Sequence, residues 1–420
     1  MKKSIFYYLS LCLMGSVMLA SCSDDEEGGG SGVENEQPAV YSIKLSAPQK
    51  KVLSQSNDFA FDVLKSINDE NTNNFVSPYS LGQALAMLAN GAEGETYDEI
   101  ARVLKIGDGA SLNDINTFYA TMNEALTSIK SSAKFAVANS LWTNQKYDSF
   151  LLGSYKTDMQ THYGAQVQAL DFSDPNSPGA INKWANKQTN GLIPSIITNL
   201  SSESHALLLN SLYFRGLWKY FPKKNTHDEM FRNQFDRNEN AKMMESDVTY
   251  LNGFLSDDEL MAEFNYGGEA FQLQIIMPIK QKINDYIAGL NGEKYAQMLT
   301  EMQSTETIVT MPKFKHSYEN QLIENMKKMG IKRAFDQGAQ LGKLSSYPGL
   351  FVTLLQQNAL IEVNEDGSTA ATVTQIQTDP TAPELPPRFI IDHPFIYIIK
   401  ERTTGVILFI GKVQTMEGMQ

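Results

Sequence analysis

The sequence predicts an α+β protein organised around a large sheet. Helical patterns fill the first half of the chain, whereas long apolar runs that suit strands follow from Ala206 onward. The run 206–214 is almost continuously apolar, which is typical of a central strand buried on both faces. Helices and strands that are segregated along a sequence favour the α+β class over alternating βαβ units.

Each expected element has its own local signal. Residues 55–67 repeat apolar side chains on one helical face. Ser77-Pro78 has the form of an N-cap with Pro at the first helical position, and it opens an apolar helix that Asn90-Gly91 ends. Further helices are expected at 97–104, at 181–200 with a break near 191–194, and at 322–329. The runs rich in apolar and β-branched residues predict strands at 135–142, 206–214, 271–277, 308–311 and 354–363, and a closing hairpin at 395–400 and 406–410.

The N-terminus carries an export signal. Lys2 and Lys3 precede an apolar run that is too short to favour a spanning helix, so 1–21 is interpreted as a signal peptide. Leu19-Ala-Ser-Cys22 matches a bacterial lipobox, in which Cys22 becomes the lipidated first residue; the alternative is a plain secretory signal. The acidic, Gly/Ser-rich segment 22–41 is expected to be a disordered tether. Its acidic start resembles the surface-export signal of some Gram-negative lipoproteins. We expect an outer-membrane lipoprotein on the cell surface, with a periplasm-facing anchor as the alternative.

The net charge and the cysteine content exclude several classes of partner and of functional site. The formal net charge is −13, and loss of Lys2 and Lys3 gives −13 − 2 = −15 for the mature chain. Such a charge argues against nucleic acid as a partner and against electrostatic binding to anionic lipid. The only cysteines are Cys12, which would leave with the signal peptide, and Cys22, which would be lipidated. The mature protein would then have no free thiol, which excludes thiol catalysis and thiolate metal sites. We expect no cofactor, no metal, and a single, monomeric domain over 42–420.

The segment 365–388 is the best candidate for function. Residues 368–378 contain no charge, aromatic, Gly or Pro and suit a strand. Residues 379–387 contain four prolines and cannot continue the interior of a sheet. An ordinary exposed linker is the simpler interpretation, but a structureless loop of this length in a compact domain is usually functional.

Six segments, in order, resemble the serpin family and span about residues 46–416. They are Asn74-Phe-Val-Ser-Pro-Tyr-Ser80, Asn210-Ser-Leu-Tyr-Phe-Arg-Gly-Leu-Trp218, Lys242-Met-Met244, Met311-Pro-Lys-Phe314, Glu365-Asp-Gly-Ser-Thr-Ala-Ala371, and Phe389-Ile-Ile-Asp-His-Pro-Phe395-Ile followed by 404–413.

The resemblance implies a serpin fold, with a large, mostly antiparallel sheet, eight or nine helices and an exposed reactive-centre loop. It implies an inhibitor rather than an enzyme. A target protease cuts the loop and forms an acyl-enzyme, and the cut loop then inserts into the main sheet and traps the protease.

Site residues are carried over from the family motifs. The hinge corresponds to Glu365, Gly367, Ser368, Ala370 and Ala371, and the small side chains there favour fast insertion. The shutter and breach correspond to Ser77, Ser80, Asn210, Trp218 and Gln357. Gln357 stands where the family has a His, which puts the usual His-centred hydrogen bonding in doubt, although Gln also donates and accepts.

The reactive bond is assigned by counting. Seventeen residues from Glu365 place it at Thr381–Ala382, whereas counting back from Pro394 gives Pro383. The small, uncharged neighbours suit elastase-like or subtilisin-like serine proteases and do not suit trypsin-like ones. A papain-like cysteine protease is a further possible target.

Other function classes have less support. The sequence lacks the Gly-x-Ser-x-Gly, Walker and His-Glu-x-x-His motifs of common hydrolases and nucleotide-binding proteins. A substrate-like or non-inhibitory surface serpin is the main alternative to an inhibitor. A glycan-binding surface lipoprotein is a third possibility, which the lipobox alone suggests and the hinge motif disfavours.

Overall fold

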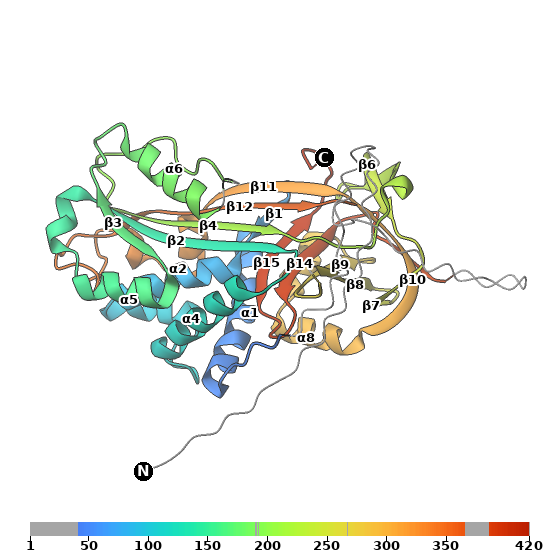
Figure 1. Ribbon diagram of the computed structural model, residues 1–420, viewed down its shortest axis with the longest axis horizontal. Coiled ribbons are helices and arrows are strands. Elements are labelled where there is room, and N and C mark those ends of the chain that lie inside the picture. Colours follow the sequence, from blue (N-terminus) through green and yellow to red (C-terminus); the bar gives the residue numbers. More distant parts are fainter. Residues whose placement is uncertain (1–40, 190, 192, 267, 366–385, 420) are drawn as a thin grey trace, which may run out of the picture. The chain divides into compact units, whose positions relative to one another are not determined.

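The structure, a computed structural model, describes residues 41–189, 191, 193–266, 268–365 and 386–419. Within these residues it has nine α-helices, three 3-10 helices and two sheets, which confirms the α+β prediction (Figure 1). The helices are α1 (Ala47–Ile67), α2 (Pro78–Gly91), α3 (Gly94–Val103), α4 (Leu112–Ser128), η1 (Gln145–Phe150), α5 (Gly153–Tyr163), α6 (Ser177–Gln188), η2 (Lys223–Asn225), α7 (Ile283–Gly289), α8 (Gly292–Glu301), α9 (Ile323–Met329) and η3 (Arg333–Phe335).

The five-stranded sheet has the order β11-β12-β4-β2-β3. Its two central neighbours, β12 and β4, are parallel, as are β2 and β3, and the other two pairs are antiparallel. The strands are β11 (Phe314–Gln321), β12 (Val352–Val363), β4 (Ala206–Arg215), β2 (Lys134–Asn144) and β3 (Gln166–Leu170).

The ten-stranded sheet follows the path β1-β15-β14-β9-β8-β7-β10-β6-β5, with β13 paired to β10. All its pairs except β10–β13 are antiparallel, so the two sheets together are mostly antiparallel, as expected. The strands are β1 (Asn74–Val76), β5 (His227–Arg232), β6 (Asn238–Glu245), β7 (Thr249–Leu255), β8 (Glu259–Tyr266), β9 (Phe271–Pro278), β10 (Gln303–Pro312), β13 (Arg388–Ile390), β14 (Phe395–Glu401) and β15 (Ile407–Val413).

Helices cover both faces of the five-stranded sheet, with α2 on one side and α6 on the other (Figure 1). Side chains alternate along a strand, so Leu208 and Leu212 of β4 face the main core, whereas Leu207 and Leu209 join the smaller cluster beneath α6. A sheet buried on both faces explains why β4 is apolar at almost every position.

The helix predicted over 181–200 forms only in its first half. The helix α6 ends at Gln188, and Gly191 takes a left-handed conformation with φ of +85°. Pro194 cannot donate a helical hydrogen bond, so the chain after it runs irregularly over the sheet. Asn182 of α6 holds this stretch, because its side-chain oxygen accepts hydrogen bonds from the backbone N–H groups of Ile196 and Ile197.

Candidate functional site

The parallel pair of β4 and β12, called the seam below, is the candidate functional site. The two strands are in register from Ala206–Val352 to Tyr213–Leu360. Beyond Val363 the chain continues from the end of β12 to Glu365, where segment 365–388 begins. A strand returning from Glu365 into the seam would run antiparallel to both neighbours. Antiparallel pairing is slightly more stable per residue than parallel pairing, so the seam can gain energy by accepting such a strand.

Trp218 closes the upper end of the seam, where β12 ends. Its indole Nε1 donates to the carbonyl oxygen of Asn364, 2.7 Å away. The ring is 3% exposed and stacks on Tyr266 with 4.8 Å between centroids. Trp218 follows β4 in the chain and Asn364 follows β12, so this hydrogen bond links the two segments that come after the strands of the seam.

Glu365 adds a second tie at the same end. The Thr226 hydroxyl donates to its Oε1 at 2.6 Å, and Lys313 Nζ lies 3.4 Å from the same oxygen. Burial by itself would raise the pKa of Glu365, but the Thr226 hydrogen bond and the Lys313 charge outweigh it and hold the pKa below its ordinary value. The carboxylate is therefore stabilised in its charged form.

We expect Glu365→Gln to lower the free energy of unfolding of the uncut protein at pH 7 by about 1–2 kcal/mol, because a charge-assisted hydrogen bond is lost. A carboxyl with a depressed folded pKa stabilises the native state above its unfolded pKa, and this contribution disappears as the pH falls through the folded pKa. The difference in urea midpoint between the two proteins should therefore be full at pH 7 and shrink below about pH 4.5. An equal difference at pH 7 and pH 3 would contradict the assignment.

Gln357 of β12 closes the middle of the seam. Its side-chain oxygen accepts from the Ser77 backbone N–H at 2.7 Å, and its Nε2 donates to the Ser77 carbonyl and to Asn210 Oδ1, each at 3.1 Å. The Ser80 hydroxyl donates to the same Asn210 oxygen at 2.7 Å. All four side chains are at most 2% exposed. One amide thus supplies two donors and one acceptor, which a neutral His ring cannot do.

The hydrogen bonds continue beneath the sheet. The Asn210 amide donates to Asn139 of β2, and Asn139 donates to Gln83 of α2 at 2.9 Å. Neither Asn139 nor Gln83 was among the site residues predicted from the sequence. Their positions could have been noticed, because each is an uncharged polar residue inside an otherwise apolar strand or helix. A polar residue that is buried in this way needs a hydrogen-bond partner.

The structure brings the predicted residues together in two groups. Ser77, Ser80, Asn210 and Gln357 meet in one network, and Trp218 and Glu365 lie at the end of β12. Several other predicted residues lie outside the described part of the chain, namely Cys22, Gly367, Ser368, Ala370, Ala371, Thr381, Ala382 and Pro383.

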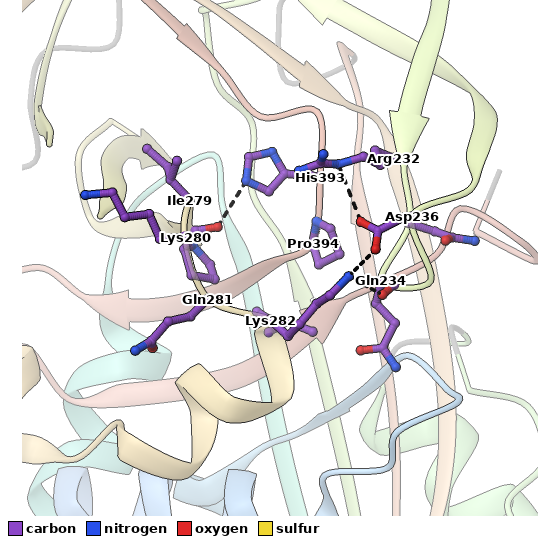
Figure 2. A pocket seen from close by; sticks show the side chains of 12 residues that line it. Arg232, Gln234, Asp236, Ile279, Lys280, Gln281, Lys282, His393 and Pro394 are labelled. Carbon is purple, nitrogen blue, oxygen red and sulfur yellow. Dashed lines mark hydrogen bonds and ion pairs between the residues drawn. The ribbon is translucent and has the colours of Figure 1, made fainter. Parts of the chain in front are cut away.

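A separate pocket of about 230 Å³ shares no residue with the seam (Figure 2). It lies where β5 and β9 end. Two of its polar side chains bond to other residues of its wall: Lys282 Nζ lies 2.5 Å from Asp236, and His393 Nε2 lies 3.0 Å from the Pro278 carbonyl oxygen. The pocket is therefore not part of the candidate site.

Comparison with known proteins agrees with this geometry. Residues 54–416 match the family described as Serpin (serine protease inhibitor). Intracellular coagulation inhibitor 2 of Tachypleus tridentatus is 30% identical over 386 residues, which are 90% of this chain and 94% of that protein. Leukocyte elastase inhibitor of Sus scrofa is 28% identical over 377 residues, 85% of this chain and 97% of that one. The crystal structure of the thermophilic serpin tengpin in its native state superposes with a TM-score of 0.78 at 26% identity and covers 90% of this chain and 97% of its own.

Proposed function

The chain belongs to the serpin family, and from that premise we propose that it is a suicide-type inhibitor of serine proteases. The observation that carries this proposal is the seam, a parallel strand pair whose upper end leads directly into segment 365–388. Residues 368–378 of that segment are uncharged, so they can enter a sheet that is covered on both faces.

The proposed reaction starts as ordinary proteolysis. The hydroxyl oxygen of the protease serine attacks the carbonyl carbon of Thr381, the Thr381–Ala382 peptide bond breaks, and Ala382 leaves with a new amino group. Thr381 is then joined to the protease by an ester. Residues from 366 onward enter the seam before water can hydrolyse that ester, and the protease is carried along.

The proposal is tested by mixing the full chain with an elastase-like serine protease. We expect a complex that survives denaturing electrophoresis. We also expect a released C-terminal peptide whose mass shows that it begins at Ala382. A peptide beginning at Glu384 would instead place the bond at Pro383–Glu384. Complete cleavage without a complex, by every protease class tested, would contradict inhibition and favour a substrate-like serpin.

The proposed specificity rests on the residues around the bond. Pro380, Thr381 and Ala382 are uncharged, and the nearest basic residue is Arg388. A small or shallow substrate pocket fits Thr381, so we expect elastase-like and subtilisin-like enzymes to be trapped faster than trypsin-like ones. Association rates measured across these classes, with a papain-like cysteine protease included, test this order.

We further propose that Cys22 is lipidated and holds the inhibitor at the outer membrane, facing the outside of the cell. The lipobox and the acidic tether support this placement. Among the described residues, no helix combines the length and the apolar character that a membrane crossing needs. Labelled fatty acid should be incorporated into the full chain and not into the Cys22→Ser variant. Protease added to intact cells should digest the protein if it faces outward.

A further inference from the structure

The lower end of the seam, where β4 and β12 begin, is also tied by side chains. His205 directly precedes β4, and its Nδ1 lies 2.9 Å from the carbonyl oxygen of Gly349. A carbonyl oxygen only accepts, so Nδ1 carries the proton and donates it. The Thr353 hydroxyl of β12 donates to the Ala206 carbonyl of β4 at 3.0 Å. Two side-chain hydrogen bonds therefore cross the seam at this end.

The His205 ring is held between aromatic side chains. Its centroid lies 4.3 Å from that of Phe351 and 5.0 Å from that of Tyr147. Tyr147 in turn packs on Tyr347, with 4.7 Å between centroids. Partial burial lowers the pKa of His205, which favours the neutral ring near pH 7. The bond to Gly349 is therefore a neutral hydrogen bond whose donor is fixed in position by packing.

Chain length places this end in the path of the inserted loop. From Glu365 to Thr381 there are 381 − 365 = 16 residue steps, which span about 53 Å as a strand at roughly 3.3 Å per residue. Strand β12 runs from Val352 to Val363, and its 11 steps span only about 36 Å. Even with a few residues used in a turn, a fully inserted segment ending at Thr381 extends past Val352 to the level of Gly349.

We propose that the His205–Gly349 hydrogen bond is the last barrier to loop insertion, and that it helps to decide how many cleaved molecules trap the protease. The proposal rests on the proposed inhibitory function. Insertion of the first residues opens the ties at Glu365 and Gln357, but the ester-linked end reaches its final place only after His205 has released Gly349. While that bond holds, water can still hydrolyse the ester and free the protease.

Two variants separate the hydrogen bond from the packing of the ring. His205→Phe keeps an aromatic ring beside Phe351 and Tyr147 but removes the donor. His205→Asn removes the ring but keeps an amide donor near the position of Nδ1. His162→Phe, on α5, is the matched control, because His162 forms no contact across the seam.

The first measurement is the rate at which the loop-cleaved full chain becomes resistant to heat, which reports insertion directly. We expect His205→Phe to insert about three- to tenfold faster than wild type, the change in rate that one net hydrogen bond can produce. His205→Asn and His162→Phe should stay near the wild-type rate. The stoichiometry of inhibition of an elastase-like protease should fall for His205→Phe in parallel.

Equal insertion rates for His205→Phe and wild type would overturn the proposal, even if the variant lowered the melting temperature of the uncut protein, because that outcome indicates a purely structural role. A wild-type chain that inserts its cut loop but never forms a complex would contradict the inhibitory function. Since the insertion rate is measured without a complex, these two failures are distinguishable.

Discussion

Ser368→Arg is expected to turn the inhibitor into a substrate, with the number of inhibitor molecules consumed per trapped protease rising tenfold or more. Ser368 lies three residues beyond Glu365, so it enters the seam among the first residues. Read with the two-residue period of a strand, it shares a face with Ala370, Thr372 and Thr374, all small and uncharged. A charged Arg on a buried face lacks a partner and costs several kcal/mol in practice.

The effect is large because insertion competes with hydrolysis of the ester. Each 1.4 kcal/mol added to the barrier of insertion slows it about tenfold, whereas hydrolysis depends on the protease and is unchanged. Cleavage of the loop in Ser368→Arg should proceed at the wild-type rate, and the cut protein should remain sensitive to heat.

Thr369→Arg is the matched control for this experiment. Thr369 belongs to the other face of the same predicted strand, which already carries the longer polar side chains of Gln375, Gln377 and Asp379. This variant should stay a better inhibitor than Ser368→Arg. Unchanged stoichiometry in Ser368→Arg, measured by titration against an elastase-like protease and by gel, would contradict loop insertion as the mechanism.

The sequence predicted those parts of the site that depend on local pattern or on motifs. The cap at Ser77-Pro78, the apolar strand that became β4 and the closing hairpin all follow from residues close together in the chain. The family motifs added Asn210, Trp218 and Gln357, which the structure places along the seam.

The remaining contacts join distant parts of the chain, and no local pattern reports them. Asn139 reaches Gln83 across 56 residues, and His205 reaches Gly349 across 144. The packing of α2 against β2 brings Asn139 to Gln83, and the pairing of β4 with β12 brings His205 to Gly349. The segment after Gln188 was misassigned for a related reason, because its irregular path is fixed by contacts with Asn182 and the sheet.

Gln357→Leu is expected to be the most damaging single change in the seam. Leu fills a similar volume but neither donates nor accepts, so the buried Ser77 N–H loses its acceptor. Asn210 Oδ1 loses one of its two donors and keeps Ser80. A buried donor without a partner costs about 1–3 kcal/mol, and the lost bonds to Ser77 and Asn210 bring the expected loss in free energy of unfolding to about 2–4 kcal/mol.

The same change should also lower the barrier that keeps the uncut native state from converting to the inserted form. Under the proposed mechanism, the inserted form gains roughly one net backbone hydrogen bond of ~1 kcal/mol for each paired residue, so the uncut protein would persist only because the hydrogen bonds across the seam oppose its opening. With the middle tie removed, uncut Gln357→Leu should convert on warming to a heat-resistant, inactive form within a time over which wild type keeps its activity.

Two comparisons make the result specific to the tie across the seam. Gln357→His replaces the amide by a ring that still donates one hydrogen bond and accepts one, so it should lose less stability than Gln357→Leu. Gln297→Leu, at an exposed position of α8, makes the same chemical change away from the seam and should leave both stability and conversion unaltered. Residual inhibitory activity and urea-gel mobility, followed during incubation, report conversion. If Gln357→Leu lost stability but converted no faster than Gln297→Leu, Gln357 would support the core without restraining the seam.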